Sequence, residues 1–456
     1  MIKQINKINL PYVLEPALHA IRHDGHQIVA IKKEDAAVTR LQTLVLTGSI
    51  NESDSNNGVS HFLEHLLFKG TDNYGPSEID KILESYGAII NAGTSKDYTQ
   101  YHITLPTKSA DIALKMHFDM LFNATLPEDE IGNKLKKDDE ITEENLMSIT
   151  RERSVVVEEI KMGLDNPMSV GQKHLFELIY AGHPYSRSII GSIKNIATIT
   201  RDEILDYYKK WYSPEYMITV VVSDLDTNDV ITLVDKELTR AHNDRYPENN
   251  PTMPPAYEML AEHNSTTKIV EQEVAQDYIL WGIKTMPSKD IKATVAGDII
   301  SFCLGDGRSS RLIQRLIEDI TDSPFIDIMS GAVSCRDSGS FLCVALINPL
   351  KRDEAEELFK REMIKLFTDD PLTDAEVRKC KTRIKSSFAA DTETAQNLAN
   401  EFVYSFAISG SVEYYAKYLE TLECIETEYI NSIIKEYLGI VDFSKIIITN
   451  SESVVS

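Results

Sequence analysis

Residues 58–70 read GVSHFLEHLLFKG, an apolar helix pattern that carries two histidines and a glutamate. Positions four apart on a helix are separated by about 40° of rotation, so His61 and His65 project from the same face. Imidazole suits zinc, and a catalytic zinc has three protein ligands and an open position for water. Glu64 lies near that face, where it could act as a general base. The order H-x-x-E-H inverts the commoner H-E-x-x-H zinc motif; a chance match on an amphipathic helix is the alternative.

Two histidines do not complete a zinc site, so a third ligand is expected further along the chain. RERSVVVEEIKMG, residues 151–163, contains Glu152 and Glu159, which are two helical turns apart and lie on one face. One carboxylate could bind the metal and the other could orient a ligand. Glu158 points elsewhere on the helix. A solvated acidic face is the alternative interpretation of these glutamates.

The order of predicted elements repeats along the chain. In the first half, the apolar pattern predicts strands within 27–49 and 88–105 and from 217, and helices over 58–68, 77–87, 109–124, 150–164 and 201–211. In the second half, it predicts strands over 278–285, within 332–348 and at 445–449, and helices over 290–303, 307–319, 353–368, 373–400 and 412–437.

The segment between the halves, residues 242–258, is rich in proline and asparagine and is typical of a linker. We therefore predict an α+β fold with two similar domains, residues 1–241 and 259–456. Each domain is expected to be an antiparallel-rich sheet with helices on one face. The strongly charged stretch 128–146 has no sustained apolar period and indicates a solvated loop.

The composition limits the classes of function. With 42% hydrophobic and 26% charged residues, the chain is a folded globular protein. Its net charge of −24 argues against binding to nucleic acid, and either favours basic partners or serves only solubility. The five cysteines are odd in number and show no CxxC spacing, which argues against a disulfide framework or a cysteine-rich zinc site.

The apolar runs, such as YILWGI at 278–283, are too short to span a bilayer, so no membrane partner is expected. The N-terminal sequence MIKQINKINLPYVLEP lacks the continuous apolar segment and the cleavage site of a secretory signal. A cytoplasmic location is therefore expected.

HFLEH followed by ERSVVVEE resembles the pitrilysin family of inverzincin metallopeptidases, in the branch of mitochondrial processing peptidase and its bacterial relatives. Other stretches match in order over nearly the whole chain, among them GAIINAGTSKDYTQYHITLP and SSRLIQRLIED. The resemblance implies one zinc ion per chain, bound by His61, His65 and Glu159. It makes Glu64 the base that activates water and Glu152 a carboxylate behind a ligand. It also implies a zinc-bearing N-terminal half and a metal-free C-terminal half, which form a clam-shell around an interior chamber.

The resemblance also assigns a role to NAGTS, residues 91–95. A peptide substrate would add as a strand to this sheet edge, with Asn91 and Ala92 near the scissile bond. An ordinary strand is the alternative. Gly93 departs from the family, which commonly has a threonine or an aromatic residue there, and this glycine could loosen the edge or widen a pocket.

Two further departures concern the completeness of the enzyme. The spacing from His65 to Glu159 exceeds the family pattern, and the charged stretch around 131–148 is the natural place for the extra length. Active members of this branch usually carry an arginine and, seven residues later, a tyrosine that hold the substrate's carbonyl. Aligned on SSRLIQ, these positions fall on Ile317 and on Pro324 or Phe325. The resemblance therefore implies the zinc-bearing member of a homo- or heterodimer whose related partner supplies the holding groups.

Together these features predict a zinc endopeptidase that cleaves unfolded peptides with a metal-activated water. The alternative is a non-catalytic scaffold subunit of a larger assembly, a role that related chains can take. Intact HFLEH and ERSVVVEE weigh against the alternative, because a scaffold does not need ligands at this spacing.

Overall fold

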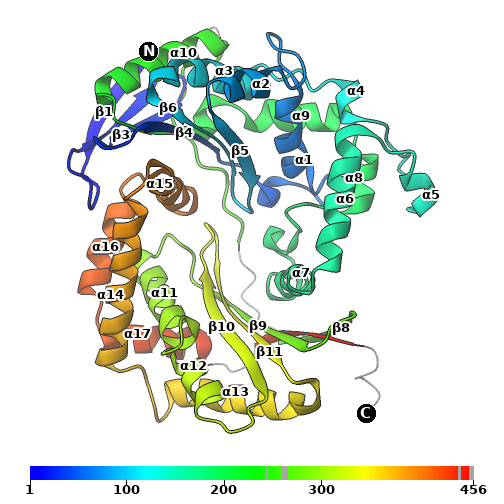
Figure 1. The fold of residues 1–456 in the computed structure, drawn as a ribbon, viewed down its shortest axis with the longest axis vertical. Helices are drawn as coiled ribbons and strands as arrows, with labels where there is room; N and C mark the ends of the chain where they lie inside the picture. Colours follow the sequence, from blue (N-terminus) through cyan, green and yellow to red (C-terminus); the bar gives the residue numbers. More distant parts are fainter. Residues whose placement is uncertain (243–244, 259–264, 440–442, 451–456) are drawn as a thin grey trace. The chain divides into compact units, whose positions relative to one another are not determined.

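The computed structural model describes residues 1–456 except 243–244, 259–264, 440–442 and 451–456. The chain divides into two units that exchange segments (Figure 1). The first unit comprises Met1–Lys161, Arg187–Pro255 and Ala389–Ala416, and the second comprises Met162–Ser186, Ala256–Phe388 and Lys417–Ser456.

The first unit contains a seven-stranded sheet in the order β1-β2-β3-β7-β4-β6-β5. Its strands are β1 (Ile2–Ile8), β2 (Ala17–Arg22), β3 (Gln27–Lys32), β4 (Val38–Val45), β5 (Ile89–Thr94), β6 (Thr99–Pro106) and β7 (Met217–Ser223). β7 is inserted between β3 and β4, parallel to the first and antiparallel to the second. β5 lies at one edge and pairs with β6.

The second unit contains a five-stranded sheet in the order β10-β11-β9-β12-β8. Its strands are β8 (Thr267–Glu271), β9 (Asp277–Thr285), β10 (Phe325–Val333), β11 (Gly339–Ile347) and β12 (Ser444–Thr449). β12 is parallel to β8 and antiparallel to β9, which repeats the placement of β7 between β3 and β4. The order β8-β12-β9-β11-β10 therefore matches β3-β7-β4-β6-β5, and the predicted internal repeat is confirmed.

The helices agree with the sequence pattern in most places. The first unit holds α1 (Val59–Leu66), α2 (Glu78–Ser85), α3 (Ala110–Phe122), α4 (Glu128–Ile131), α5 (Glu143–Leu146), most of α6 (Arg151–Asp165), α8 (Ile193–Thr198), α9 (Arg201–Trp211), α10 (Thr227–His242) and α15 (Ala395–Ser409). The second holds α7 (Pro167–Ile179), α11 (Ile291–Gly305), α12 (Arg311–Ile313), α13 (Arg352–Phe367), most of α14 (Asp374–Asp391), most of α16 (Tyr414–Cys424) and α17 (Thr427–Ile433).

The predicted helix over 373–400 is wrong in one respect, because it is two helices, α14 and α15. Thr394 ends the continuity: its side chain accepts a hydrogen bond from the backbone of Asn397 and caps the new helix. The expected helix over 412–437 is likewise divided into α16 and α17. The chain leaves the second unit for the first within the last turn of α14, just before the break that follows this helix.

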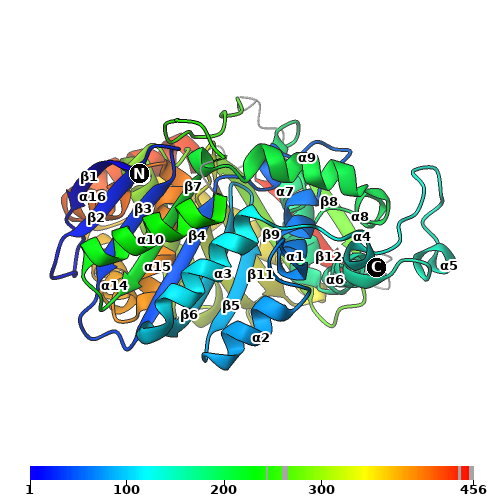
Figure 2. The same ribbon diagram turned by 90° about the horizontal axis from the view of Figure 1, so that it is seen from above.

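Helices cover both faces of the first sheet (Figure 2 shows α3 over β4 and β6, and α10 toward β2 and β3). Neighbouring residues on a strand point to opposite faces. On β4, Thr43 Oγ1 lies 2.8 Å from Nε2 of His117 on α3, whereas Arg40 donates a hydrogen bond of 3.1 Å to Asn400 on α15. The local helices thus lie on one face, as expected, and α15 from the second half of the sequence covers the other.

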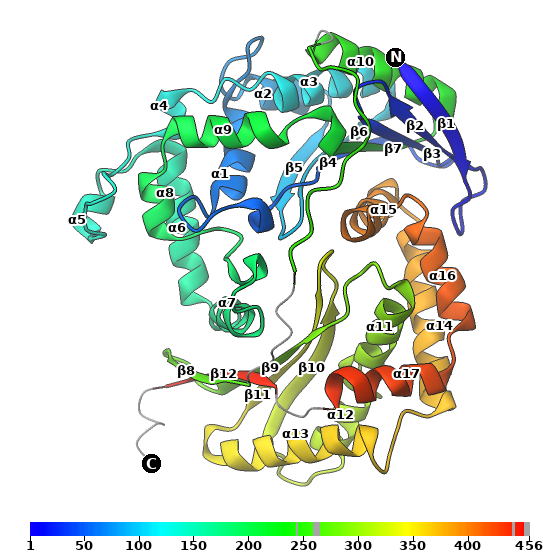
Figure 3. The same cartoon turned by 180° about the vertical axis from the view of Figure 1, so that it is seen from behind.

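The second sheet shows the same arrangement (Figure 3). Trp281 on β9 stacks on Phe359 of α13, with ring centroids 4.1 Å apart. On the opposite face, a Cβ added to Gly171 of α7 would meet Leu280 of β9 at 2.8 Å. Gly171 thus permits the close approach of α7, a helix that comes from the first half of the sequence. The α+β class with two similar halves is confirmed. Each sheet, however, also packs against one helix that comes from the other half of the sequence, α15 on the first sheet and α7 on the second.

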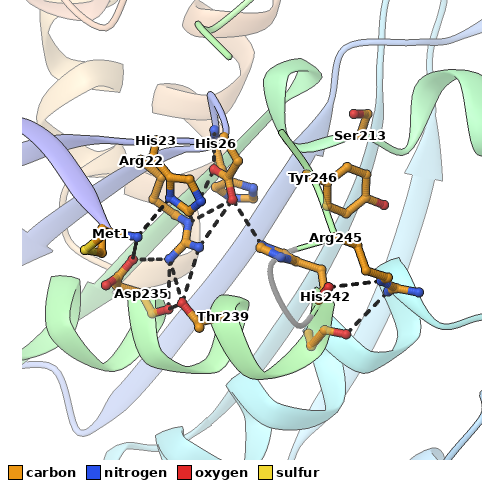
Figure 4. A network of polar contacts seen from close by, with 12 residues as sticks. Met1, Arg22, His23, His26, Ser213, Asp235, Thr239, His242, Arg245 and Tyr246 are labelled. Atoms are coloured by element: carbon orange, nitrogen blue, oxygen red, sulfur yellow. Dashed lines mark hydrogen bonds and ion pairs between the residues drawn. The ribbon is translucent and has the colours of Figure 1, made fainter. Parts of the chain in front are cut away.

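A buried ionic network ties β2 and the turn after it to α10 (Figure 4). The side chains of Arg22, Asp24 and His242 are fully buried. Arg22 donates to Asp24 at 3.2 Å and also pairs with Asp235, and His242 Nε2 lies 3.1 Å from Asp24. Burial opposes the ionisation of Asp24, but His242 and Arg22 hold its pKa well below the ordinary value. The network fixes one end of the first sheet.

Parts of two predicted segments lie outside the described residues. They are residues 243–244 of the expected linker, 242–258, and residues 259–264, 440–442 and 451–456 of the expected second domain. Between 245 and 258 the described chain forms neither helix nor strand. The domain limits 1–241 and 259–456 stay a prediction, because the two units cross that division. Within the described ranges, no helix combines the length and the apolarity that crossing a membrane requires.

Candidate metal centre

The helix that carries the histidines, α1, is fixed at its first turn. Gly58 has φ 103°, and a Cβ there would meet the carbonyl oxygen of Ile190 at 2.8 Å, so glycine is required. The buried carboxylate of Glu52 accepts hydrogen bonds of 2.8 Å from the backbone nitrogens of Gly58 and Ser60. Glu52 therefore satisfies donors that the helix start leaves free. The apolar face of α1 is buried in the core, which fixes the direction of His61 and His65.

α6 brings the third group to these histidines. Val156, Val157 and Ile160 bury one face of α6 in the same core that holds α1. One oxygen of Glu159, Oε2, lies 3.7 Å from His61 Nε2 and 3.6 Å from His65 Nε2. One ligand atom from each of the three residues lies within 4.8 Å of the others. The structure thus brings together the three residues that the family resemblance implied as metal ligands.

The donor set fits a zinc ion. Nitrogen and carboxylate ligands about 2.0–2.2 Å from a tetrahedral zinc are separated from each other by roughly 3.3–3.6 Å. The two distances to Glu159 Oε2 are close to that range. Burial, with the neighbouring His65, lowers the pKa of His61 to about 4, so its ring is neutral near neutral pH. Neutral imidazole is the form that binds metal.

Glu152 holds His65 from behind. Its Oε1 lies 2.8 Å from His65 Nδ1, and its Oε2 lies 2.6 Å from Lys69 Nζ. Burial opposes the ionisation of Glu152, but His65 and Lys69 hold its pKa below the ordinary value. The carboxylate thus keeps a proton on Nδ1 and leaves Nε2 free toward Glu159. Glu152 thus lies beside His65, and its role behind a metal ligand stays a prediction; the contact with Lys69 was not anticipated.

Glu64 lies beside the three residues but does not belong to their cluster. Its side chain is buried, and the hydroxyl of Thr94 donates a hydrogen bond of 2.6 Å to Oε2. Burial raises the pKa of Glu64, against the opposing effect of the Thr94 bond. Thr94 is the last residue of β5, so this bond joins the sheet edge to α1. The sequence analysis predicted a substrate-binding role for the segment NAGTS, but it did not predict a role for Thr94.

The predicted substrate-binding residues lie on the edge strand β5. Asn91 pairs with His102 and Gly93 with Gln100 of β6, so each is bonded on one side of the strand. All three residues, including Ala92, are partly or largely exposed. A Cβ added to Gly93 would meet only Gln100 Nε2 within 4 Å, at 3.8 Å, so there is room for a larger side chain at this position. Its effect on the edge stays a prediction.

Comparison with known families matches both halves of the chain. Residues 27–192 match the model described as insulinase, peptidase family M16, and residues 198–384 match the M16 peptidase inactive domain. The chain belongs to the M16 peptidase family. The expected pitrilysin-type resemblance is therefore confirmed, and the second M16 half is of the type described as inactive.

Individual relatives agree with the family. Zinc protease PqqE of Helicobacter pylori is 28% identical over 404 residues, which cover 87% of this M16 chain and 85% of that protein. The uncharacterized zinc protease YmxG of Bacillus subtilis is 25% identical, with 91% and 93% covered. A protease structure from Helicobacter pylori has a TM-score of 0.81 at 24% identity, with 98% and 99% covered. This last likeness supports the fold alone.

The second M16 half lacks polar groups at the expected substrate-holding positions. Ile317 lies in the π-helical turn Gln314–Glu318, and Phe325 begins β10 with its side chain buried. Two nearby arginines are held by carboxylates: Arg311 by Glu376 at 2.7 Å and Arg315 by Asp370 at 2.5 Å. Both arginines thus have structural partners of their own.

Proposed function

We propose that this chain is a zinc-dependent endopeptidase that hydrolyses unfolded peptides. The observation that carries the proposal is the approach of His61, His65 and Glu159 within 4.8 Å, beside the buried carboxylate of Glu64. The names of the relatives as zinc proteases support the same class. The interior chamber expected from the resemblance stays a prediction.

Each residue of the centre has a role in this reaction. A bound zinc would polarise the scissile carbonyl and lower the pKa of a water molecule. His61 and His65 would hold the ion through Nε2, and Glu159 through a carboxylate oxygen. Glu64 would take the proton of the attacking water and pass it to the leaving amine. Because burial raises the pKa of Glu64, this side chain is suited to carry a proton between the two steps.

The substrate would bind along the free edge of β5. Backbone groups of Asn91, Ala92 and Gly93 would pair with an extended peptide, which gives affinity with little selection of side chains. The hydrogen bond from Thr94 to Glu64 supports this placement, because it brings the strand end beside the proposed base. A folded protein cannot add a strand in this way, so unfolded peptides are the proposed substrate class.

A related subunit is proposed as partner, in a homo- or heterodimer. Without an arginine or tyrosine at Ile317 and at Pro324 or Phe325, the chain lacks the expected donors to the substrate carbonyl. Loss of one oxyanion donor costs on the order of 10² to 10³ in rate in other hydrolases. A partner that supplies those donors would restore the activity. A scaffold role without catalysis is the second candidate, favoured by the same missing donors.

The test is cleavage of a mixed peptide library by the purified full-length chain. The comparison variant is Glu64→Gln at matched zinc content, and the control is Glu158→Gln, which changes an exposed carboxylate of α6. We expect cleavage that is lost in Glu64→Gln, kept in Glu158→Gln and abolished by a chelator. Cleavage that persists in Glu64→Gln would overturn the role of Glu64.

Metal analysis separates the two candidate functions. One tightly bound zinc per chain without cleavage would direct the search to a partner that co-purifies with the chain. A chain that binds no zinc, even at high zinc concentrations, would favour the scaffold role. We also propose a cytoplasmic location, a compartment in which free thiols such as these five are common. Detection of the protein in the extracellular or periplasmic fraction of its own cells would contradict it.

A further inference from the structure

Two cysteines far apart in the sequence meet in the second unit. Cys303 lies near the end of α11 and Cys380 lies in α14, and their sulfurs are 2.9 Å apart. This separation is within hydrogen-bonding distance for two thiols and is about 0.9 Å longer than a disulfide bond of ~2.05 Å. Both side chains are buried, with 5% of each residue exposed. Neither residue contributes to the metal centre.

One face of α14 holds the segment that follows α11. Lys379 donates to the carbonyl and the hydroxyl of Ser309, at 2.8 Å and 2.5 Å. Arg383 donates to Asp306 Oδ1 at 2.9 Å, and Glu376 accepts from Arg311. These α14 residues are three or four positions apart, with Cys380 among them, so they share one helical face. Noncovalent contacts therefore already align the two sulfurs.

We propose that Cys303 and Cys380 form a reversible disulfide that peroxide generates and that ties α11 to α14. The residues are in place before the reaction, so the bond requires the sulfurs to move together without any rearrangement of the helices. A small oxidant is specified because both thiols are largely covered. Hydrogen peroxide is small enough to reach these thiols, whereas a bulky disulfide reagent is too large to do so.

The surroundings determine the order of the steps. The hydrogen bond from Cys303 lowers the pKa of Cys380, and Lys379 and Arg383 act in the same direction. Hydrogen bonding to Cys380 and burial raise the pKa of Cys303. Cys380 is thus the thiolate that reacts first, because the thiolate is the nucleophile toward peroxide. Cys303 is the resolving thiol.

Two waters leave in the reaction. The Cys380 thiolate attacks one peroxide oxygen, the O–O bond breaks, and the departing hydroxide takes a proton to become water. Cys303 then attacks the sulfenic sulfur, the S–O bond breaks, and the second water leaves with the thiol proton. Two thiols and one hydrogen peroxide give one disulfide and two waters. Both sulfurs are oxidised and both peroxide oxygens are reduced, so the balance closes.

The bond would immobilise the segment between α11 and α12. Asp306 and Ser309 are now held to α14 by exposed hydrogen bonds that open and close readily. A covalent link at Cys303 fixes the start of this segment on the same helix. Because it joins residues 77 positions apart, it also restricts the unfolded chain. The oxidised protein is therefore expected to melt roughly 10 °C higher in its second unit.

The test uses the reduced full-length chain titrated with hydrogen peroxide. After the peroxide is removed, the chain is unfolded in the presence of an alkylating reagent that blocks the remaining free thiols, and a protease digest is analysed by mass spectrometry. We expect a linked peptide pair that contains Cys303 and Cys380, is lighter by two hydrogens and is separated by dithiothreitol. Amide hydrogen exchange over 306–311 should slow in parallel. The control is Cys424→Ser, which removes an exposed thiol and should leave the cross-link intact.

Two results would overturn the proposal. One is peroxide that consumes Cys424 while Cys303 and Cys380 remain alkylatable thiols. The other is a linked pair that appears only after the chain is unfolded in urea. Cys303→Ala and Cys380→Ala should each lose the peroxide-dependent rise in melting temperature. If these variants fail to fold, the peptide map of the unmodified sequence decides the question alone.

Discussion

Oε1 of Glu152 lies 2.8 Å from Nδ1 of His65, on the side of the ring that faces away from Glu159. The two ring nitrogens thus have different partners, one a hydrogen-bonding carboxylate and the other the candidate metal position. A glutamate two helical turns from Glu159 on α6 sets the tautomer of a histidine on α1. The metal affinity should therefore depend on a residue that does not touch the metal.

Replacing Glu152 by glutamine keeps the shape of the side chain but removes its charge. Glu152→Gln is expected to weaken zinc binding by about 10- to 100-fold, because His65 becomes a poorer and less oriented ligand. Competition with a chromophoric chelator measures the affinity. Glu158→Gln, on the exposed side of the same helix, should bind zinc as the unmodified chain does. Equal affinities for all three proteins would contradict the role assigned to Glu152.

Thr94→Val should impair catalysis without removing the metal. The substitution deletes the hydroxyl that donates to Glu64 while it keeps the branched shape of the residue on β5. A hydrogen bond to a charged group contributes about 1.5–3 kcal/mol, so cleavage should slow by at least about 10-fold. Zinc content and peptide cleavage are measured on the same sample. Thr232→Val, at an exposed position of α10, serves as the control, and a loss of zinc in Thr94→Val would refute this account.

Two buried histidines should make the first unit sensitive to acid. Burial lowers the pKa of His26 and of His117 to about 3, whereas the ordinary value is 6.5. Between these values the unfolded chain binds more protons than the folded one, so stability falls as the pH drops below about 6.5. Above that range the two residues contribute no pH dependence. Each should contribute a slope of about 1.4 kcal/mol per pH unit.

His117→Gln removes one of these slopes. Urea unfolding between pH 7 and pH 5 is followed by Trp211 fluorescence in a Trp281→Phe background, so that the signal reports the first unit. The free energy of unfolding should fall less steeply with acid in His117→Gln, and the difference in slope should rise to about 1.4 kcal/mol per pH unit at the acidic end of this range. Identical slopes in the two proteins would show that His117 is not buried in neutral form.

Asp24→Asn should destabilise the first unit strongly. The substitution leaves Arg22 and His242 buried without the carboxylate that now lies between them. Removal of one partner from a buried ionic group costs about 3–5 kcal/mol. Urea unfolding monitored by Trp211 gives the free energy, and Asp226→Asn, at an exposed site, is the matched control. A cost below about 1 kcal/mol would mean that Asp235 alone can hold Arg22.

The sequence alone was sufficient to predict the helices of the candidate metal centre and the repeated order of strands. Local periodicity located α1 and α6 within two residues of their bounds, and spacing placed His61 and His65 on one helical face. Spacing left Glu152 and Glu159 as alternatives, and only the family resemblance selected Glu159. Periodicity reports only neighbours along the chain, so it did not indicate where α7 and α15 pack. It also missed Glu52, because a carboxylate that caps a helix from six residues upstream has no fixed spacing.

The division of the predicted helix over 373–400 has the same origin. Thr394 is a common cap residue, but a helical pattern on both sides concealed it. Likewise, no sequence signal joins Cys303 to Cys380, since a contact between cysteines 77 residues apart follows only from the packing of α11 on α14. Contacts made by distant segments are the part that one sequence does not reveal.

The return of α15 to the first unit has a consequence for synthesis. During translation the ribosome releases the N-terminal half first, yet that half cannot bury the β4 face around Arg40 until Asn400 has emerged. The first sheet must therefore wait, with one side uncovered, while most of the remaining chain is made. A nascent chain stalled before residue 389 would hold every proposed zinc ligand and still expose this surface to chaperones.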